Sequence, residues 1–86
     1  MTTLSTYEIE IRQTGNHQRL DATNRRAALE HYSEALSNHL VGGWEVRELL
    51  GEASATTYRS GVVLQHPEHT GAVEIWLTET PLTRAR

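Results

Sequence analysis

The chain begins with alternating hydrophobic and charged side chains. Within Leu4 to Gln13, the apolar residues Tyr7, Ile9 and Ile11 alternate with charged residues, a period that places them on one face of a strand. A polar turn around Gly15, whose backbone suits a tight connection, leads into a second such run over residues 17–22. We therefore predict an N-terminal β-hairpin.

The hydrophobic spacing then changes to three and four residues from about Asn24 to Val41, which is typical of an amphipathic helix. Thr23 or Asn24 can cap its first turn through a side-chain oxygen, and the pair Gly42-Gly43 can end it. The apolar stripe of this helix consists of Ala28, Tyr32, Ala35, Leu36, His39 and Leu40.

Three further β-like runs follow the helix. They cover residues 44–50, 57–66 and 72–79, separated by a flexible connection over 51–56 and a turn over 66–71, with Pro81 ending the last strand and residues 82–86 as a frayed tail. This β-β-α-β-β-β order predicts one α+β domain over residues 1–86. We expect a single antiparallel β-sheet of four to five strands with one α-helix packed on one face.

The alternation assigns side chains to the two faces of the sheet. The predicted core is Tyr7, Ile9, Ile11, Leu20, Tyr32, Leu36, Leu40, Val46, Val62, Leu64, Val73, Ile75 and Leu77, with Trp44 in phase with it. The opposite face carries Glu8, Glu10, Arg12, Glu45, Arg47, Glu74, Trp76 and Thr78. Gly61 lies inside its strand, which suggests a bulge or a bend.

Composition narrows the class of protein. The 86 residues include eleven acidic and eight basic side chains, all arginine, for a net charge of −3, and no cysteine. Without Arg84 and Arg86 in the predicted tail the net charge is −5, which disfavours non-specific binding to phosphate backbones. Neither a secretion signal nor an apolar run of about 18 residues is present, so we expect a cytoplasmic protein that does not enter a membrane.

Catalytic and metal-binding patterns are weak. No serine lies in a strand-to-helix elbow, and no glycine-rich loop precedes a helix to hold phosphate. His66 and His69 flank a predicted turn without a third histidine close in sequence, and we interpret them as turn residues. We expect no enzyme activity, no cofactor and no metal.

Because the sequence shows no strong catalytic or metal-binding pattern, we expect the protein to act through its surface. Trp76 is the predicted anchor of a protein-binding site, because exposed tryptophan is enriched at binding hot spots; cover by the C-terminal tail or by a second copy is the alternative. Carboxylates around it could imitate a row of phosphates on a basic groove of another protein. The predicted partner-binding residues are Glu8, Glu10, Glu45, Glu48, Glu52, Glu74 and Trp76.

The segments Tyr7–Ile11, Leu20–Leu29 and Trp44–Leu49 resemble, in layout and size, small phage-encoded anti-CRISPR inhibitors of type I surveillance complexes. In that layout a hairpin enters the only helix and a strand returns beside it. The resemblance implies a non-catalytic inhibitor that binds a host protein and blocks its nucleic-acid groove. It carries over no functional residue.

Three functions therefore stay open at this point. The preferred one is the phage anti-defence inhibitor, acting in the host cytoplasm. The second is a self-associating structural domain that pairs through an open sheet edge. The third is a nucleic-acid binder that uses Arg12, Arg25 and Arg26.

Overall fold

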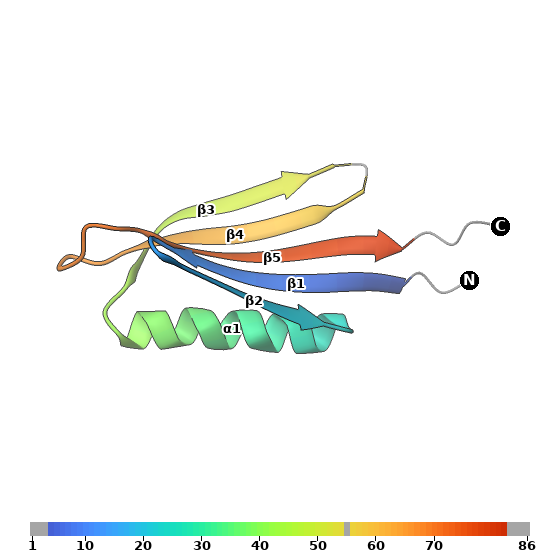
Figure 1. The fold of residues 1–86 in the computed structure, drawn as a ribbon, viewed down its shortest axis with the longest axis horizontal. Helices are drawn as coiled ribbons and strands as arrows, with labels where there is room; N and C mark the ends of the chain where they lie inside the picture. Colours follow the sequence, from blue (N-terminus) through green and yellow to red (C-terminus); the bar gives the residue numbers. More distant parts are fainter. Residues whose placement is uncertain (1–3, 55, 83–86) are drawn as a thin grey trace.

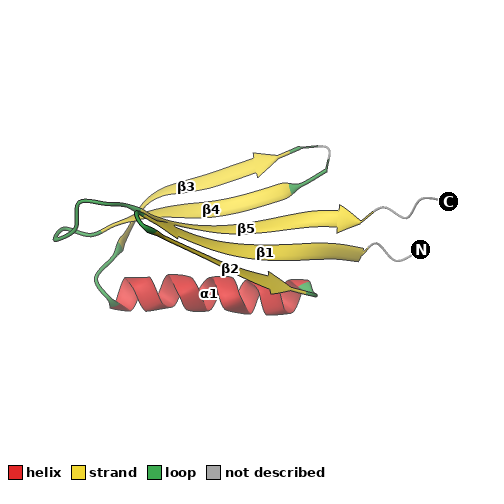
Figure 2. Cartoon of the chain, viewed as in Figure 1, coloured by secondary structure: helices red, strands yellow, loops and turns green. Residues whose placement is uncertain are grey.

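The computed structural model describes residues 4–54 and 56–82. Its elements are β1 (Leu4–Gln13), β2 (Asn16–Ala22), α1 (Arg25–Val41), β3 (Glu45–Ala53), β4 (Tyr58–Gln65) and β5 (Val73–Leu82). The five strands form one antiparallel sheet in the order β2-β1-β5-β4-β3 (Figure 1). The helix forms a second layer on one face (Figure 2), so the predicted α+β fold is confirmed.

Local sequence explains both ends of the helix. Asn24 is the N-cap, and its Oδ1 accepts a hydrogen bond from the Ala27 amide at 2.8 Å, which satisfies one of the amides left without a partner in the first turn. At the other end the chain leaves through Gly42 and Gly43, and Gly43 has a φ of 96°. Few residues other than glycine adopt this conformation readily.

The helix carries the chain from one edge of the sheet to the other. It begins after the edge strand β2, packs mainly on β2, β1 and β5, and leads into the opposite edge strand, β3. Ala28 and Ala35 are buried at the contact with the sheet. Their small side chains allow the helix backbone to approach the strands closely.

The core lies between the helix and the central strands. Its fully buried large side chains come from β1, β4 and β5: Ile9, Val62, Leu64, Val73 and Ile75. Further predicted core residues are half-buried and pack against them: Tyr7, Ile11, Tyr32, Leu36, Trp44 and Leu77. Strand alternation correctly assigned Tyr7, Ile11, Trp44 and Leu77 to the core, and the helical spacing correctly assigned Tyr32 and Leu36.

The prediction that Leu20, Leu40 and Val46 belong to the core is wrong, because all three side chains are exposed. Leu20 is on an edge strand, and Leu40 is in the last helical turn, beside the exposed Val41. Val46 also lies on an edge strand, where the helix does not cover it.

Two strand boundaries also differ from the prediction. Strand β3 continues through residues 51–53, which were expected to be a loop, and β5 continues past Glu79 to Leu82. Pro81 is tolerated because the last residues of β5 pair with β1 only, and β4 begins opposite Glu79. One side of the strand therefore needs no donor at the proline. Of the tail predicted over residues 82–86, Leu82 belongs to β5 and the rest lies outside the described residues.

One helix is too narrow to cover this sheet. Strands lie about 4.8 Å apart, so five of them span roughly 19 Å between the edge axes, whereas a helix with its side chains is about 10 Å across. Consequently the helix-side surface of β3 is exposed, with Leu49 at 79%. The other face of the sheet has no covering layer at all within the described residues (Figure 1).

Candidate functional site

The face of the sheet opposite the helix, here called the open face, gathers most of the charged residues. The strand register brings three rows of side chains together across all five strands. From β2 to β3 the rows are Asp21-Glu8-Thr78-Arg59-Glu52, then Arg19-Glu10-Trp76-Gly61-Leu50, then His17-Arg12-Glu74-Val63-Glu48, and Glu45 follows beside Gln65. All seven predicted partner-binding residues therefore lie on this one face.

A β-bulge contributes to this gathering. The register of β3 against β4 shifts between Val46 and Glu48, leaving Arg47 as an extra residue. Without the shift, Glu48 and Glu52 would fall on the helix side with Val46, because facing alternates along a strand. The bulge thus turns two carboxylates to the open face and Leu49 to the helix side.

The open face is acidic as a result. At the regular register positions it carries seven carboxylates against three arginines, a net charge of −4 with histidine neutral. Glu45, Glu48 and Glu52 on β3 are exposed, whereas Glu8 and Glu74 are half-buried. This is a large share of the eleven acidic residues of the chain, so the charge is strongly segregated.

Trp76 lies on the open face, as predicted, but it is not an exposed anchor. Only 5% of it is accessible, because its indole lies against Gly61 of the neighbouring strand, which presents no side chain there. The guanidinium of Arg59 caps the ring at 4.3 Å from its centroid. The indole Nε1 donates a hydrogen bond to Glu74 at 2.8 Å. Within the described residues the neighbouring strands therefore already cover the tryptophan, and residues 83–86 of the tail predicted as an alternative cover lie outside them.

Glu10 is the second buried member of the face, with 5% of its surface accessible. Its Oε2 accepts hydrogen bonds from Arg12 at 2.8 Å and contacts His17 Nε2 at 3.2 Å. Burial favours a raised pKa for Glu10, but hydrogen bonds from Glu8, Arg12 and His17 and the charge of Arg12 outweigh it and lower the pKa to about 2. The hydrogen bond to Glu10, with a smaller effect of burial, raises the pKa of Glu8.

Trp76 and Glu10 therefore form the framework of the face rather than its contact surface. A further ion pair joins Arg59 to Glu52 at 3.3 Å, and Arg59 also donates to the Thr78 hydroxyl. A hollow of about 600 Å³ opens at the edge near β1 and β2, where Glu8 and Asp21 are direct neighbours. Like charges in opposite positions repel, so these two carboxylates would gain from a cation.

Three of the five histidines gather around Trp44 at the other end of the molecule. His69 stacks on its indole at 5.4 Å, while His66 and His39 meet it edge-on. Both ring nitrogens of His66 are engaged, one with the Gly42 carbonyl at 3.2 Å and one with the Glu68 amide at 3.0 Å. Among the described residues no group of three or more histidine or acidic side chains is arranged to hold a metal ion.

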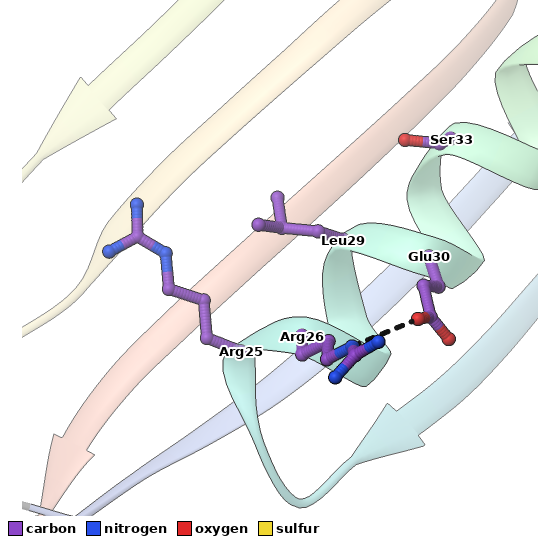
Figure 3. A pocket seen from close by; sticks show the side chains of 5 residues that line it. All are labelled: Arg25, Arg26, Leu29, Glu30 and Ser33. Carbon is purple, nitrogen blue, oxygen red and sulfur yellow. Dashed lines mark ion pairs between the residues drawn. The ribbon is translucent and has the colours of Figure 1, made fainter.

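A shallow hollow of about 690 Å³ lies along an exposed flank of the helix (Figure 3). Its lining side chains are all exposed: Arg25, Arg26, Leu29, Glu30 and Ser33. Arg26 and Glu30 pair with each other across one turn at 3.4 Å. Arg12 lies on the opposite face of the sheet, so the three arginines considered for nucleic-acid binding form no common patch.

Sequence reasoning missed several members of the open face. Asp21 and Arg59 complete its charge pattern, and Gly61 makes room for the tryptophan. The alternation of side chains along β2 and β4 could have assigned Asp21 and Arg59 to this face. The pairing of Gly61 with Trp76, however, depends on the register between β4 and β5, which the sequence does not specify.

Comparisons with family models, curated proteins and solved structures find no match to this chain. Among the described residues no helix is both long and apolar enough to cross a membrane.

Proposed function

We propose that this chain is a non-catalytic protein-binding domain, and that its open face covers a basic, nucleic-acid-binding surface of a partner protein. The observation that carries the proposal is the register, because it places seven carboxylates on one face. Complementary charge steers association and selects partners. A protein that occupies such a groove excludes the nucleic acid and so acts as an inhibitor.

The burial of Trp76 changes the proposed contact set. We assign contact to the six open-face carboxylates that are exposed or half-buried: Glu8, Asp21, Glu45, Glu48, Glu52 and Glu74. Trp76 and Glu10 support them from within the face. The interaction is therefore predominantly electrostatic, without an aromatic anchor, and its affinity should fall steeply as ionic strength rises.

The resemblance in layout to small phage inhibitors suggests a biological role, a partner and a location for this proposed binding. Small phage inhibitors of type I surveillance complexes are non-catalytic and act on nucleic-acid-binding host proteins. We propose the same role here, with a surveillance-complex subunit as the partner and the host cytoplasm as the location.

Affinity capture from host lysate with paired variants tests the proposal. The test variant is Glu45→Gln/Glu48→Gln/Glu52→Gln, and the control is Glu30→Gln/Glu34→Gln/Glu68→Gln, which removes the same charge away from the open face. Each triple also breaks one surface ion pair, Glu52 with Arg59 or Glu30 with Arg26. A genuine partner is retained by wild type and control, is lost with the test variant, and releases bound nucleic acid when the chain is added. Equal capture by both triples would contradict the role of the open face.

A second function is favoured by the apolar surface that the helix leaves uncovered. Leu49 and Val46 on β3 and Tyr58 on β4 are exposed on the helix side, beside an edge strand with unpaired backbone groups. Apolar side chains grouped at an edge are typical of an interface. Self-association through β3 is therefore the alternative to inhibitor function.

Light scattering over a range of protein concentrations separates the two functions. A dimer that Leu49→Lys converts to monomer would favour self-association. Leu40→Lys is the control, because Leu40 is similarly apolar and exposed but lies on the helix. A monomer at every concentration would exclude this alternative and leave the open face as the binding surface.

A further inference from the structure

A cleft of about 320 Å³ lies on the helix side of the sheet, at the end where the helix begins. Its floor consists of two rows from neighbouring strands: Tyr7-Glu79-Tyr58 and Leu77-Ser60. Its wall consists of Arg25, Leu29 and Tyr32 from the helix. It is separate from the open face, because the sheet lies between them.

Two opposite charges line this cleft without pairing with each other. Among the described residues Glu79 has no ion pair and accepts one hydrogen bond, from the Ser5 hydroxyl at 3.1 Å. Arg25 likewise forms no ion pair there, although its side chain extends from the helix toward β4 (Figure 3). The cleft therefore presents a negative group in its floor and a positive group in its wall.

Between these charges the lining is apolar and aromatic. Tyr7 and Tyr58 flank Glu79 on both neighbouring strands, which places their β-carbons about 5 Å from that of the glutamate. Tyr32 is half-buried, and Leu29 is exposed at the mouth. Tyrosine faces attract cations, so they add to Glu79 as a site for an ammonium group.

We infer that this cleft binds a free α-amino acid with an aromatic side chain. The α-ammonium group would pair with Glu79 between Tyr7 and Tyr58, and the α-carboxylate would pair with Arg25, whose planar guanidinium suits a carboxylate. The positive end of the helix dipole lies on the same side as Arg25 and favours the carboxylate. The ligand ring would lie on the leucine and tyrosine side chains.

Other ligand charges fit the cleft less well. A simple cation would meet Arg25 and the helix N-terminus, and a simple anion would meet Glu79. Only a molecule that carries both charges pairs with both residues. The volume is at the lower end of the range for small-molecule sites, which suits a single amino acid rather than a larger ligand.

Titration with four related compounds, followed by NMR of the tyrosine ring signals, tests the inference. The probes are phenylalanine, N-acetylphenylalanine, phenylalanine amide and glycine, which keep both charges, lose the cation, lose the anion and lose the ring, respectively. We expect saturable shifts with phenylalanine in the millimolar range, and affinity about five- to tenfold weaker for each of the others. No saturable shift with phenylalanine, or equal affinity for all four, would overturn the inference.

Paired variants assign each charge to its residue. Glu79→Gln should abolish the preference for phenylalanine over its N-acetyl derivative, and Arg25→Gln should abolish the preference over the amide. Arg26→Gln is the matched control, because Arg26 is on the same turn but does not line the cleft. Circular dichroism and thermal unfolding establish that each variant is folded, and Tyr58→Phe, which keeps the ring, should bind as wild type does. Preferences that persist in both charge variants would also overturn the inference, and either result leaves the open-face proposal unaffected.

Discussion

A glycine in the middle of β4 determines where the tryptophan of the open face lies. Gly61 pairs directly with Trp76, and a β-carbon built on it would lie 2.7 Å from two atoms of the indole. Aromatic side chains commonly cover glycine in a neighbouring strand and so limit the loss of packing there. A residue expected to mark a bulge instead makes room for a buried ring.

Gly61→Ala should therefore displace Trp76 and destabilise the fold by about 1–3 kcal/mol, as overpacking does. Chemical denaturation measures the loss, and tryptophan emission in a Trp44→Phe background should shift to longer wavelength as the indole enters water. Gly51→Ala is the control, because no atom lies within 4 Å of its added β-carbon. Equal stability of the two alanine variants would show that the Gly61 contact is unimportant.

Glu10 should make stability depend on acid. Its pKa is about 2 in the folded chain against an ordinary 4.5, so the native state holds the ionised form more favourably than the unfolded chain does. The resulting stabilisation is complete above about pH 4.5 and is lost as the pH falls toward 2. We expect Glu10→Gln to cost on the order of 1–3 kcal/mol at neutral pH and to flatten the pH dependence in that window.

Denaturant unfolding at several pH values between 2 and 7 measures this effect. Glu34→Gln, on the exposed side of the helix, is the control and should keep the wild-type slope. A Glu10→Gln variant that loses stability in acid as steeply as wild type would assign the effect to other carboxylates.

At the scale of elements, the helix and the edge strand β3 differ in how fully their sequences specify them. The helix has a cap, a stripe of small and large apolar residues, and a glycine end, and its bounds follow the prediction to within a residue. Strand β3 contains a bulge at Arg47 that no local sequence pattern predicts. The bulge reverses the facing of every later residue in the strand, which is why Val46 and Leu50, expected on one face, lie on opposite faces.

The helix cap can be tested directly. Asn24→Ala removes the acceptor of the Ala27 amide and should cost about 1 kcal/mol, lowering the melting temperature by about 4–8 °C for a domain of this size. Thr23→Ala, at the other position considered for the cap, should change it by no more than a few tenths of a kcal/mol. Equal effects of the two substitutions in thermal unfolding would contradict the assignment of the cap to Asn24.

These cases indicate how far the sequence determines the fold and the site. Alternation assigned Ile9, Val62 and Ile75 to the core, and it put Glu8 and Glu74 together on the other face. It could not place Glu48, whose facing depends on the bulge, nor the burial of Trp76, which depends on strand register. Side-chain facing is a local property, whereas pairing between distant strands depends on the whole sheet.

At the scale of the whole molecule, a single helix leaves two kinds of surface available. The helix side keeps an uncovered apolar part at β3 and a cleft with two unpaired charges near the start of the helix. The other side is the acidic open face, in which the side chains of Trp76 and Glu10 are buried. Charge is thus segregated across the sheet, and the proposed partner and the proposed small ligand would bind on opposite sides.

This segregation has a cost in the free protein that salt should reduce. Seven carboxylates on one face, only partly offset by three arginines, repel one another, and unfolding separates them. Raising the ionic strength from about 0.01 M to about 0.15 M shortens the Debye length from about 30 Å to about 8 Å, so we expect the free energy of unfolding to rise by roughly 0.5–1 kcal/mol. Urea denaturation at the two salt concentrations measures the change.

The stability of the triple variant Glu45→Gln/Glu48→Gln/Glu52→Gln should depend less on salt than that of the Glu30→Gln/Glu34→Gln/Glu68→Gln control, because only the former removes charge from the open face. A free energy of unfolding that falls with added salt would contradict this prediction. It would mean that the ion pairs of Glu10 and Glu52 outweigh the repulsion. The open face would then be neutralised by its own arginines, and it would have no excess negative charge with which to bind a basic partner.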